Sequence, residues 1–267
     1  MTEKKRVTYL GAEFDIALAE DAPAYFLFGI RKSGSSIANA MITALANYSN
    51  VNFVDVAGQL FAKGVSVPAW QNDAGLGELL HGGNLYGGFR NAPLGILQHP
   101  RLQSGPKVLL VRDPRDALVS EYFSNAYSHS IPAEGETREM MLQIRSQALN
   151  ASVRDYVLTK APLFARTMRE YQGFLSMPGM RVYRYEDAIM NKGWFLRGVC
   201  EHFGWTVSDA QIGQILNWAD VMPDEERPTE FVRRVKPGDH RDKLDEATIA
   251  KLDEMLADEL AWFGYKN

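Results

Sequence analysis

The sequence predicts an α/β fold, a three-layer sandwich with a central, mostly parallel sheet and a P-loop-like loop after its first strand. Two observations lead to this prediction. Short runs that are apolar on both faces alternate with longer segments of helical period, as in sheets covered by helices on both sides. A loop rich in glycine and serine joins the apolar run 25–30 to a helix that begins near Ser35. Backbone amides in that order hold phosphate.

The expected strands are short and buried, and the helices between them follow from periodicity and capping. In 35–48 the apolar residues Ile37, Met41, Leu45 and Tyr48 share one helical face. Asp113-Pro114 is typical of an N-cap followed by proline at the first helical position. The expected strands are 25–30, 51–56, 107–111 and 180–185, and the expected helices are 35–48, 115–127, 147–174, 187–203, 208–219 and 245–263.

Three segments carry weaker signals. Residues 57–105 are rich in glycine, with Gly82-Gly83 and Gly87-Gly88, and remain unassigned. Residues 128–146 are predicted to form an exposed loop or lid. Residues 222–243 contain three prolines and many charges and are predicted to form another loop.

Length and composition bound the class of protein. The 267 residues are enough for one large α/β domain, so we expect a single domain over 1–267. The net charge of -4 argues against a general nucleic-acid binder, which is usually strongly basic. Cys200 is the only cysteine, which excludes internal disulfides and multi-cysteine metal sites. No apolar run has the length of a membrane span or a signal peptide, so we expect a cytoplasmic chain.

The loop Gly29-Ile-Arg-Lys-Ser-Gly-Ser-Ser36 is the first candidate site. Its amides would face an anion at a helix N-terminus, where the helix dipole also favours negative charge. Lys32 precedes the loop glycine, whereas in the Walker sequence the lysine follows it and Ser35 stands in its place here. Taken alone, the stretch also fits an ordinary serine-rich helix cap.

The second candidate site is Arg112-Asp-Pro-Arg-Asp-Ala-Leu-Val-Ser120, directly after the run Lys-Val-Leu-Leu-Val. An arginine at the carboxyl end of a strand points into the crevice where open α/β sheets bind ligands. The alternative is that Arg112 pairs with Asp116 or binds a backbone carbonyl.

Together these residues resemble the sulfotransferases that use 3′-phosphoadenosine 5′-phosphosulfate (PAPS). That family pairs a strand-x-x-Lys-Ser-Gly-[Ser/Thr]-[Ser/Thr]-helix stretch with a later strand-Arg-x-Pro-[Arg/Lys]-Asp-x-x-x-Ser. Two more stretches are similar: Tyr185-Glu-Asp187 at the end of the strand expected over 180–185, and Arg233-Arg-Val-Lys-Pro-Gly-Asp-His-Arg241. The late stretch departs from the family pattern, because Val235 replaces a glycine and His240 a tryptophan. The resemblance spans about 25–263 and implies a P-loop-like sulfotransferase fold.

The resemblance also implies roles for individual residues. Lys32 and the amides of 33–36 would hold the 5′-phosphosulfate, and Arg112, Ser120 and Arg233 would hold the 3′-phosphate. Tyr185 would lie near the base. The expected nucleotide-binding residues are Arg31, Lys32, Ser33, Gly34, Ser35, Ser36, Arg112, Ser120, Tyr185, Arg233, Arg234 and Val235. The co-substrate would be PAPS, the product adenosine 3′,5′-bisphosphate (PAP), and no metal would be required.

The general base is left open. Where many cytosolic members have a histidine, this chain reads Gly87-Gly-Phe-Arg-Asn-Ala-Pro93, and asparagine cannot take a proton at neutral pH. The candidates are Asp55, His99 and His81, and the expected catalytic residues are Lys32, Asp55 and His99. Arg90 could orient an anionic acceptor or the sulfuryl group, or form an ordinary salt bridge.

The sequence thus predicts a sulfotransferase that acts on a hydroxyl or amine of a small-molecule, lipid or carbohydrate acceptor. It indicates no nucleic-acid partner and leaves the oligomeric state open. Two alternatives remain: a P-loop kinase or nucleotide hydrolase, and a nucleotide-binding protein without catalysis.

Overall fold

The computed structural model describes residues 3–129, 131, 136–227, 229–230 and 232–265. These residues fall into two compact units: Met1–Val111 with Glu170–Asp220, and Arg112–Arg169 with Val221–Asn267. The first unit holds all the strands of the described chain, and the second is helical. The expected single domain over 1–267 stays a prediction.

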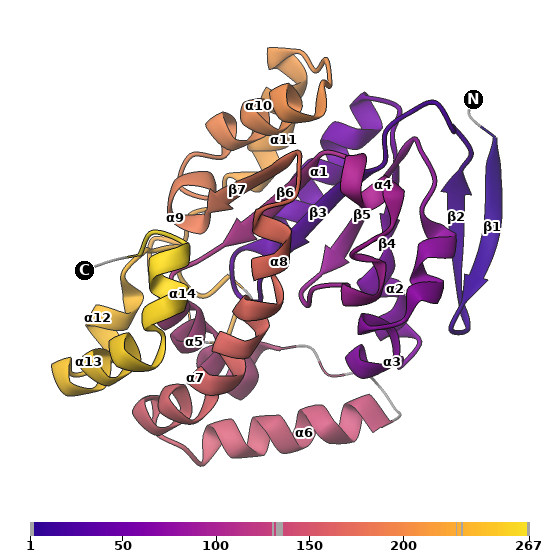
Figure 1. The fold of residues 1–267 in the computed structure, drawn as a ribbon. Helices are drawn as coiled ribbons and strands as arrows, with labels where there is room; N and C mark the ends of the chain where they lie inside the picture. The colour runs from indigo at the N-terminus through magenta and orange to yellow at the C-terminus, as the bar shows by residue number, and fades with distance from the viewer. Residues whose placement is uncertain (1–2, 130, 132–135, 228, 231, 266–267) are drawn as a thin grey trace. The chain divides into compact units, whose positions relative to one another are not determined.

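A five-stranded parallel sheet forms the centre of the first unit, in the order β4-β5-β3-β6-β7 (Figure 1). Its α/β architecture confirms the predicted fold class. The strands are β3 (Tyr25–Gly29), β4 (Asn52–Asp55), β5 (Asn84–Phe89), β6 (Lys107–Val111) and β7 (Met180–Arg184). An antiparallel hairpin of β1 (Lys4–Tyr9) and β2 (Ala12–Ala17) precedes them. It was not predicted from the sequence.

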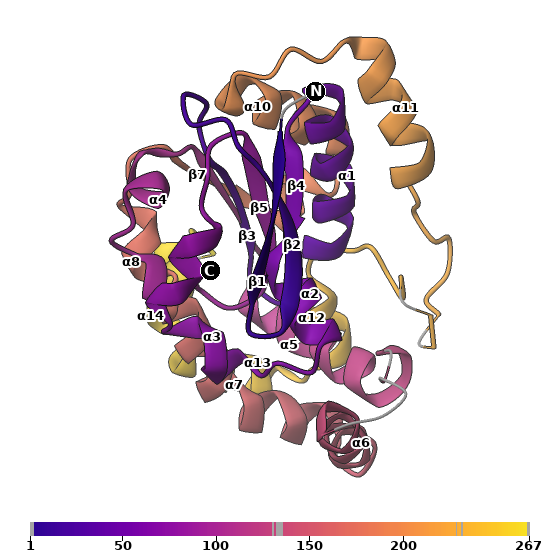
Figure 2. The same cartoon turned by 90° about the vertical axis from the view of Figure 1, so that its right-hand side faces the viewer.

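Helices cover both faces of the sheet (Figure 2). Because side chains alternate along a strand, the central strand β3 sends Phe26 and Phe28 to one face and Tyr25 to the other. Phe28 meets the rings of Tyr171 and Phe174, and Tyr25 meets those of Phe203 and Trp205. One layer contains α1 (Ser35–Tyr48), α10 (Lys192–Phe203) and α11 (Asp209–Ala219), and the opposite layer contains α4 (Pro100–Ser104) and α8 (Gln172–Leu175).

Short elements complete the first unit. They are α2 (Val56–Ala62), α3 (Val67–Gln71), η1 (Ala74–Leu79), η2 (Leu94–Ile96) and α9 (Tyr185–Ala188). The glycine-rich region left unassigned therefore holds one central strand, β5, and several one- or two-turn helices.

The second unit is built from α5 (Pro114–Phe123), a π-helical turn η3 (Ser124–Ser128), α6, α7 and three C-terminal helices. The bounds of the others are α6 (Glu136–Leu149), α7 (Val153–Glu170), α12 (Asp239–Lys243), α13 (Glu246–Met255) and α14 (Ala257–Trp262).

Five predicted elements are wrong in their details. The loop expected over 222–243 ends in the short helix α12. The loop expected over 128–146 contains most of α6, although 130 and 132–135 lie outside the described residues. The helix expected over 147–174 is α7 and α8, separated at Tyr171. The helix expected from 187 begins at Lys192, capped by Asn191. The last expected helix breaks at Leu256 into α13 and α14. Over the described ranges, no helix is long and apolar enough to cross a membrane.

Asn84 joins the N-terminal hairpin to the sheet. Its side chain is fully buried and forms hydrogen bonds with the backbone of Ala17 in both directions, at 2.9 Å each. It also donates to the carbonyls of His81 and Gly82, and it accepts from the amide of Asn52. This single buried side chain therefore satisfies backbone groups of two segments and the side-chain amide of Asn52.

We predict that Asn84→Ala destabilises the protein by about 3 kcal/mol or more, because each buried polar group left without a partner costs about 1–3 kcal/mol. Urea unfolding would measure the change. Asn150→Ala, at an exposed helix end, is the matched control and should stay within about 0.5 kcal/mol of the unmodified protein. Equal effects of the two substitutions would contradict the role given to Asn84.

Candidate active site

The loop after β3 has the backbone geometry of an anion cradle. Lys32 and Gly34 have positive φ angles of 64° and 76° on either side of Ser33, and such left-handed residues turn successive amides to one side. Positive φ is uncommon for a lysine and points to a functional constraint. Gly34 is the N-cap of α1 and provides no side-chain cap. The first amides of this 14-residue helix therefore remain for a ligand.

Ser33 and Gly29 position this loop. The amide and the hydroxyl of Ser33 both donate to the carbonyl of Ile30, at 3.1 and 2.6 Å. Ser33 is fully buried, so it closes the turn, and the amides directed at an anion begin at Gly34. A side chain at Gly29 would put its Cβ 2.7 Å from that of Ser35, so glycine lets α1 start directly over the end of β3.

Tyr185 lies against the same loop. It follows β7 as the first residue of α9 and is buried. A Cβ at Gly34 would lie 3.0 Å from the Tyr185 ring and 3.0 Å from Ile189. Gly34 is therefore required both for its φ angle and for space, and the first unit brings Tyr185 together with the loop that contains Lys32.

Asp55 and Arg90 lie at the same edge of the sheet, because they follow the parallel strands β4 and β5. Asp55 is the N-cap of α2, and its Oδ1 accepts from the amide of Gly58 at 3.1 Å. Arg90 donates to the carbonyl of Gly88 at 3.0 Å and to the hydroxyl of Ser36 at 3.5 Å. The guanidinium of Arg90 is poorly solvated because it is buried, and this burial lowers its pKa. A cation with these neighbours favours an anion beside Ser36.

His99 and His81 lie at the opposite edge of the sheet. His99 is the N-cap of α4, whose C-cap Gly105 packs against the carbonyl of Ala24, just before β3. His81 precedes β5, and its Nδ1 lies 2.9 Å from Glu20. A five-residue strand is roughly 16 Å long. The structure therefore does not bring either histidine together with Lys32, whereas it does bring Asp55 to the edge that carries the loop.

In the second unit, one face of α5 carries the other candidate residues. Asp116, Ser120 and Phe123 are four and three residues apart and so share a face. Asp116 binds the segment 238–240, and Phe123 lies under the guanidinium of Arg233 at 4.3 Å. Ser120 lies between these two contacts. The helix therefore brings Ser120 and Arg233 to one surface of this unit.

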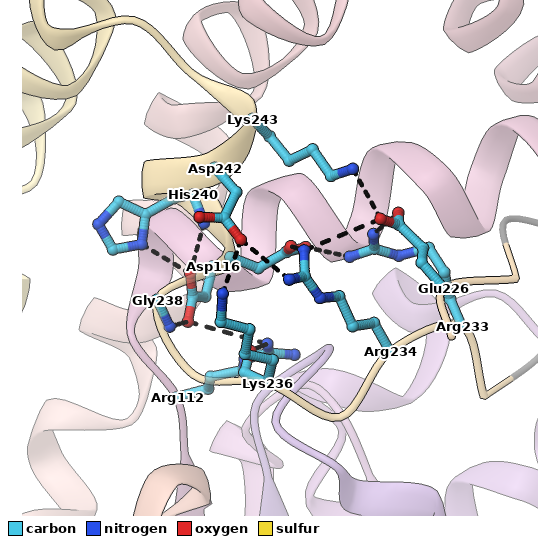
Figure 3. Close-up of polar contacts among 11 residues, drawn as sticks. Arg112, Asp116, Glu226, Arg233, Arg234, Lys236, Gly238, His240, Asp242 and Lys243 are labelled. Carbon is cyan, nitrogen blue, oxygen red and sulfur yellow. Dashed lines mark hydrogen bonds and ion pairs between the residues drawn. The ribbon is translucent and has the colours of Figure 1, made fainter. Parts of the chain in front are cut away.

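The carboxylate of Asp116 organises that surface (Figure 3). It accepts from the amides of Gly238 and His240 at 2.7 and 2.9 Å, and its Oδ1 lies 2.6 Å from His240 Nδ1. Arg112 lies 3.8 Å from Asp116 and donates to the carbonyl of Lys236 at 3.5 Å. Burial acts to raise the pKa of Asp116, but the His240 hydrogen bond and the Arg112 charge outweigh it and lower that pKa. Both alternatives considered for Arg112, an ion pair and a carbonyl contact, are thus present.

The late loop, residues 233–241, takes part in a network of opposite charges (Figure 3). Arg233 is buried and binds Glu226 and Asp239. Arg234 binds Asp239 and Asp242, and Lys236 binds Asp242 at 2.8 Å. Asp116 fixes the main chain of this segment at Gly238 and His240, near its C-terminal end.

Three roles were not anticipated from the sequence. Arg115 ties the start of α5 to α13, because its guanidinium binds Asp113 at 2.7 Å and Asp253 at 2.6 Å. Asp116 and His240 form the pair that fixes the late loop. The spacing of Asp116, Ser120 and Phe123 places them on one helical face, and this signal could have identified Asp116 from the sequence. Among the residues described, no group of three or more His, Cys, Asp or Glu could hold a metal ion.

We predict that Asp116→Asn destabilises the second unit by about 3 kcal/mol, since breaking a buried charge pair typically costs that much. The side-chain amide would also place a donor against the amide of Gly238 or His240. Thermal or urea unfolding would measure this. Asp242→Asn, whose side chain is largely exposed, is the control and should cost less than about 1 kcal/mol.

The same pair gives a pH dependence. The lowered pKa of Asp116 in the folded chain means that its carboxylate stabilises the fold above the ordinary aspartate pKa. This stability is lost as the pH falls through the folded-state value. In Asp116→Asn the fall of stability below about pH 4 should therefore be shallower. An unchanged acid limb would contradict the pairing.

The protein is similar to known proteins in its structure. No protein-family model matches the sequence, and no curated protein matches it. The structure is similar to that of mouse sulfotransferase SULT7A1 complexed with PAP, with a TM-score of 0.60 and 12% identity over 96% of this chain and 95% of that one. Retinol dehydratase in complex with androsterone and PAP matches with a TM-score of 0.49 and 15% identity, over 97% of this chain and 90% of that one. A sulfotransferase from Alicyclobacillus acidocaldarius matches at 0.42 and 14%, over 88% and 96%. The chain thus has the fold of the PAP-bound mouse sulfotransferase.

Proposed function

We propose that this protein is a sulfotransferase that moves the sulfuryl group of PAPS to a hydroxyl or amine of a small-molecule, lipid or carbohydrate acceptor. The observation that carries the proposal is the loop at 29–36, where positive φ at Lys32 and Gly34 leads into the uncapped start of α1. The shared fold with a PAP-bound sulfotransferase supports the same reading.

The loop residues would provide positioning and charge stabilisation. The amides of 34–36 would hold the 5′-phosphosulfate, and Lys32 would stabilise the negative charge that grows on the bridging oxygen as the sulfur–oxygen bond breaks. Arg90, at Ser36, would add positive charge on the side of the sulfuryl group. Sulfuryl transfer of this kind needs an aligned in-line geometry more than covalent catalysis.

The proposed 3′-phosphate subsite lies within the second unit. Arg112, Ser120 and Arg233 supply two guanidinium groups and a hydroxyl, which suit a phosphate dianion. Arg234 and the backbone at Val235 belong to the same segment, and Arg31 belongs to the loop of the first unit. Tyr185, packed on Gly34, would lie beside the nucleoside.

Asp55 would act as general base and take the proton of the acceptor hydroxyl while the new sulfur–oxygen bond forms. It lies at the loop edge of the sheet, whereas His99 and His81 lie at the other edge. The other carboxylate oxygen, Oδ2, would accept the proton, since the amide of Gly58 binds Oδ1. The acceptor itself would be shaped by segments within 57–105 and 128–146, which follow strand ends.

The first experiment compares ligands. PAP at 100 times its dissociation constant should stabilise the protein by about 2.7 kcal/mol, and it should do so without magnesium. ATP with magnesium should give a smaller shift in the melting temperature at equal concentration. A preference for ATP with magnesium would favour a P-loop kinase and contradict the proposal.

Lys32→Asn tests the catalytic lysine. Asparagine tolerates the left-handed conformation and removes the charge, so folding should persist while sulfuryl transfer falls by about 10²–10³-fold. The measurement is transfer from PAPS to a panel of acceptors, with the exposed Lys63→Asn as the control. Transfer that is absent even in the unmodified protein, together with binding of PAP, would indicate a binding protein without catalysis.

Asp55→Asn tests the general base. Asparagine is as good an N-cap as aspartate, so α2 and PAP binding should be retained. Transfer should fall by about 10²–10⁴-fold, because no group would then take the proton of the acceptor. His99→Gln and His81→Gln should leave the rate within about twofold of the unmodified enzyme. A larger loss in a histidine variant than in Asp55→Asn would assign the base to that histidine.

A further inference from the structure

The guanidinium of Arg233 is already occupied by carboxylates. Both of its terminal nitrogens form ion pairs, one with Glu226 and one with Asp239. The ring of Phe123 lies 4.3 Å from its central carbon and covers one face. Arg233 is therefore a buried cation whose two terminal nitrogens already bind carboxylates of the same chain. It is nevertheless the residue proposed to hold the 3′-phosphate.

The two carboxylates differ in their setting. Asp239 is almost fully buried as the first residue of α12, and it binds Arg234 at 2.8 Å as well as Arg233. This makes Asp239 part of the scaffold that aims the guanidinium groups. Its buried carboxylate cannot leave without exposing two cations to a poorly solvated site.

Glu226 comes from the proline-rich segment before the loop and is more exposed than Asp239, with 22% of its side chain accessible. The amide of Arg227 donates to the carbonyl of Arg233 at 3.0 Å, which holds Glu226 against that arginine. Lys243 donates to the second oxygen of Glu226 at 2.7 Å, and Arg234 lies 3.8 Å away. The carboxylate of Glu226 is thus surrounded by the cationic groups of Arg233, Lys243 and Arg234, as a bound phosphate group would be.

The electrostatics agree with this description. Burial acts to raise the pKa of Glu226, but the hydrogen bonds of Lys243 and Arg233 lower it below the ordinary glutamate value. Glu226 is thus held ionised at neutral pH. A bound anion at Arg233 would have to share this guanidinium with a full negative charge or displace it.

We propose that Glu226 competes with the 3′-phosphate of the nucleotide for Arg233, and so sets the affinity of the protein for 3′-phosphorylated nucleotides. Asp239 positions the arginine, and Glu226 occupies the nitrogen that the phosphate takes. Binding then exchanges one anion for another: the phosphate gains the charge-assisted bond from Arg233 while Glu226 keeps Lys243. This inference rests on the proposed function.

The test is calorimetric titration of PAP into the unmodified protein and into Glu226→Gln, with adenosine 5′-monophosphate as the ligand that lacks the 3′-phosphate. Glutamine keeps the size of the side chain and removes the charge. We expect PAP to bind Glu226→Gln about tenfold more tightly, which corresponds to about 1.4 kcal/mol. Adenosine 5′-monophosphate should bind both proteins equally.

Two further variants serve as controls. Glu230→Gln removes a carboxylate of the same segment that pairs only with the surface residue Arg227 among the contacts described, and it should leave PAP affinity unchanged. Asp239→Asn should weaken PAP binding, in contrast to Glu226→Gln, because it disturbs the positioning of the arginines. Melting temperatures of each variant would verify folding.

The results distinguish a failure of competition by Glu226 from a failure of the proposed function. If PAP binds the unmodified protein but binds Glu226→Gln equally or more weakly, Glu226 does not compete and the inference is overturned. If adenosine 5′-monophosphate gains as much as PAP, the effect is not specific to the 3′-phosphate and the inference is also overturned. If neither protein binds PAP, the proposed function falls and this inference falls with it.

Discussion

The parallel pairing of β3 with β5 and β6 is the constraint on which the candidate site depends. Because neighbouring strands run in the same direction, every loop that leaves a strand emerges at one edge of the sheet. That edge receives the loop with Lys32, the start of α2 with Asp55, the Gly88–Arg90 segment and Tyr185. None of these residues is close to another in the sequence. The sheet, rather than any local motif, brings them together, and it also removes His81 and His99 to the far edge.

Buried charge plays the corresponding part in the second unit. Asp116 lies inside the unit, where a carboxylate is costly unless donors surround it. Two backbone amides and the imidazole of His240 provide these donors. The segment that carries them, 238–240, is therefore held against α5, the helix that carries Asp116.

How far the sequence could be interpreted depended on the strength of each local signal. The strands β3 and β6 were predicted closely because each is a run of buried residues, and α1 was predicted at its observed ends. β5 was missed because its sequence, Asn-Leu-Tyr-Gly-Gly-Phe, carries two glycines that normally indicate a loop. Those glycines are explained by packing: Phe53 lies against Gly87 and Asp55 against Gly88. In α6 the buried Met141 and Ala148 lie seven residues apart, a helical period that the surrounding polar residues obscured.

The site residues divide along the same line. The positions of Lys32, Gly34 and Arg112 in the fold could be predicted because each follows the end of a buried strand within five residues, where position in the sequence nearly determines position in space. The choice among Asp55, His81 and His99 could not be made, since the two edges of a sheet look alike until strand order and direction are known. The ion pairs of Arg233 were equally out of reach, because Glu226 and Asp239 meet it through the fold of an irregular loop.

The two candidate phosphate subsites therefore treat an anion differently. The loop after β3 presents neutral amides at a helix terminus beside the cations Lys32 and Arg90, and the amides require no counter-charge in the absence of a ligand. The cluster at Arg233 presents buried cations, which do require one, and the chain supplies carboxylates for it. A subsite of amides gains the whole of its interaction with an incoming anion, whereas a subsite of paired arginines gains only the difference between the new partner and the old. In the proposed enzyme, discrimination for the 3′-phosphate would thus depend on how weakly the internal carboxylate is held. In this molecule that carboxylate is Glu226, the more exposed of the two that bind Arg233.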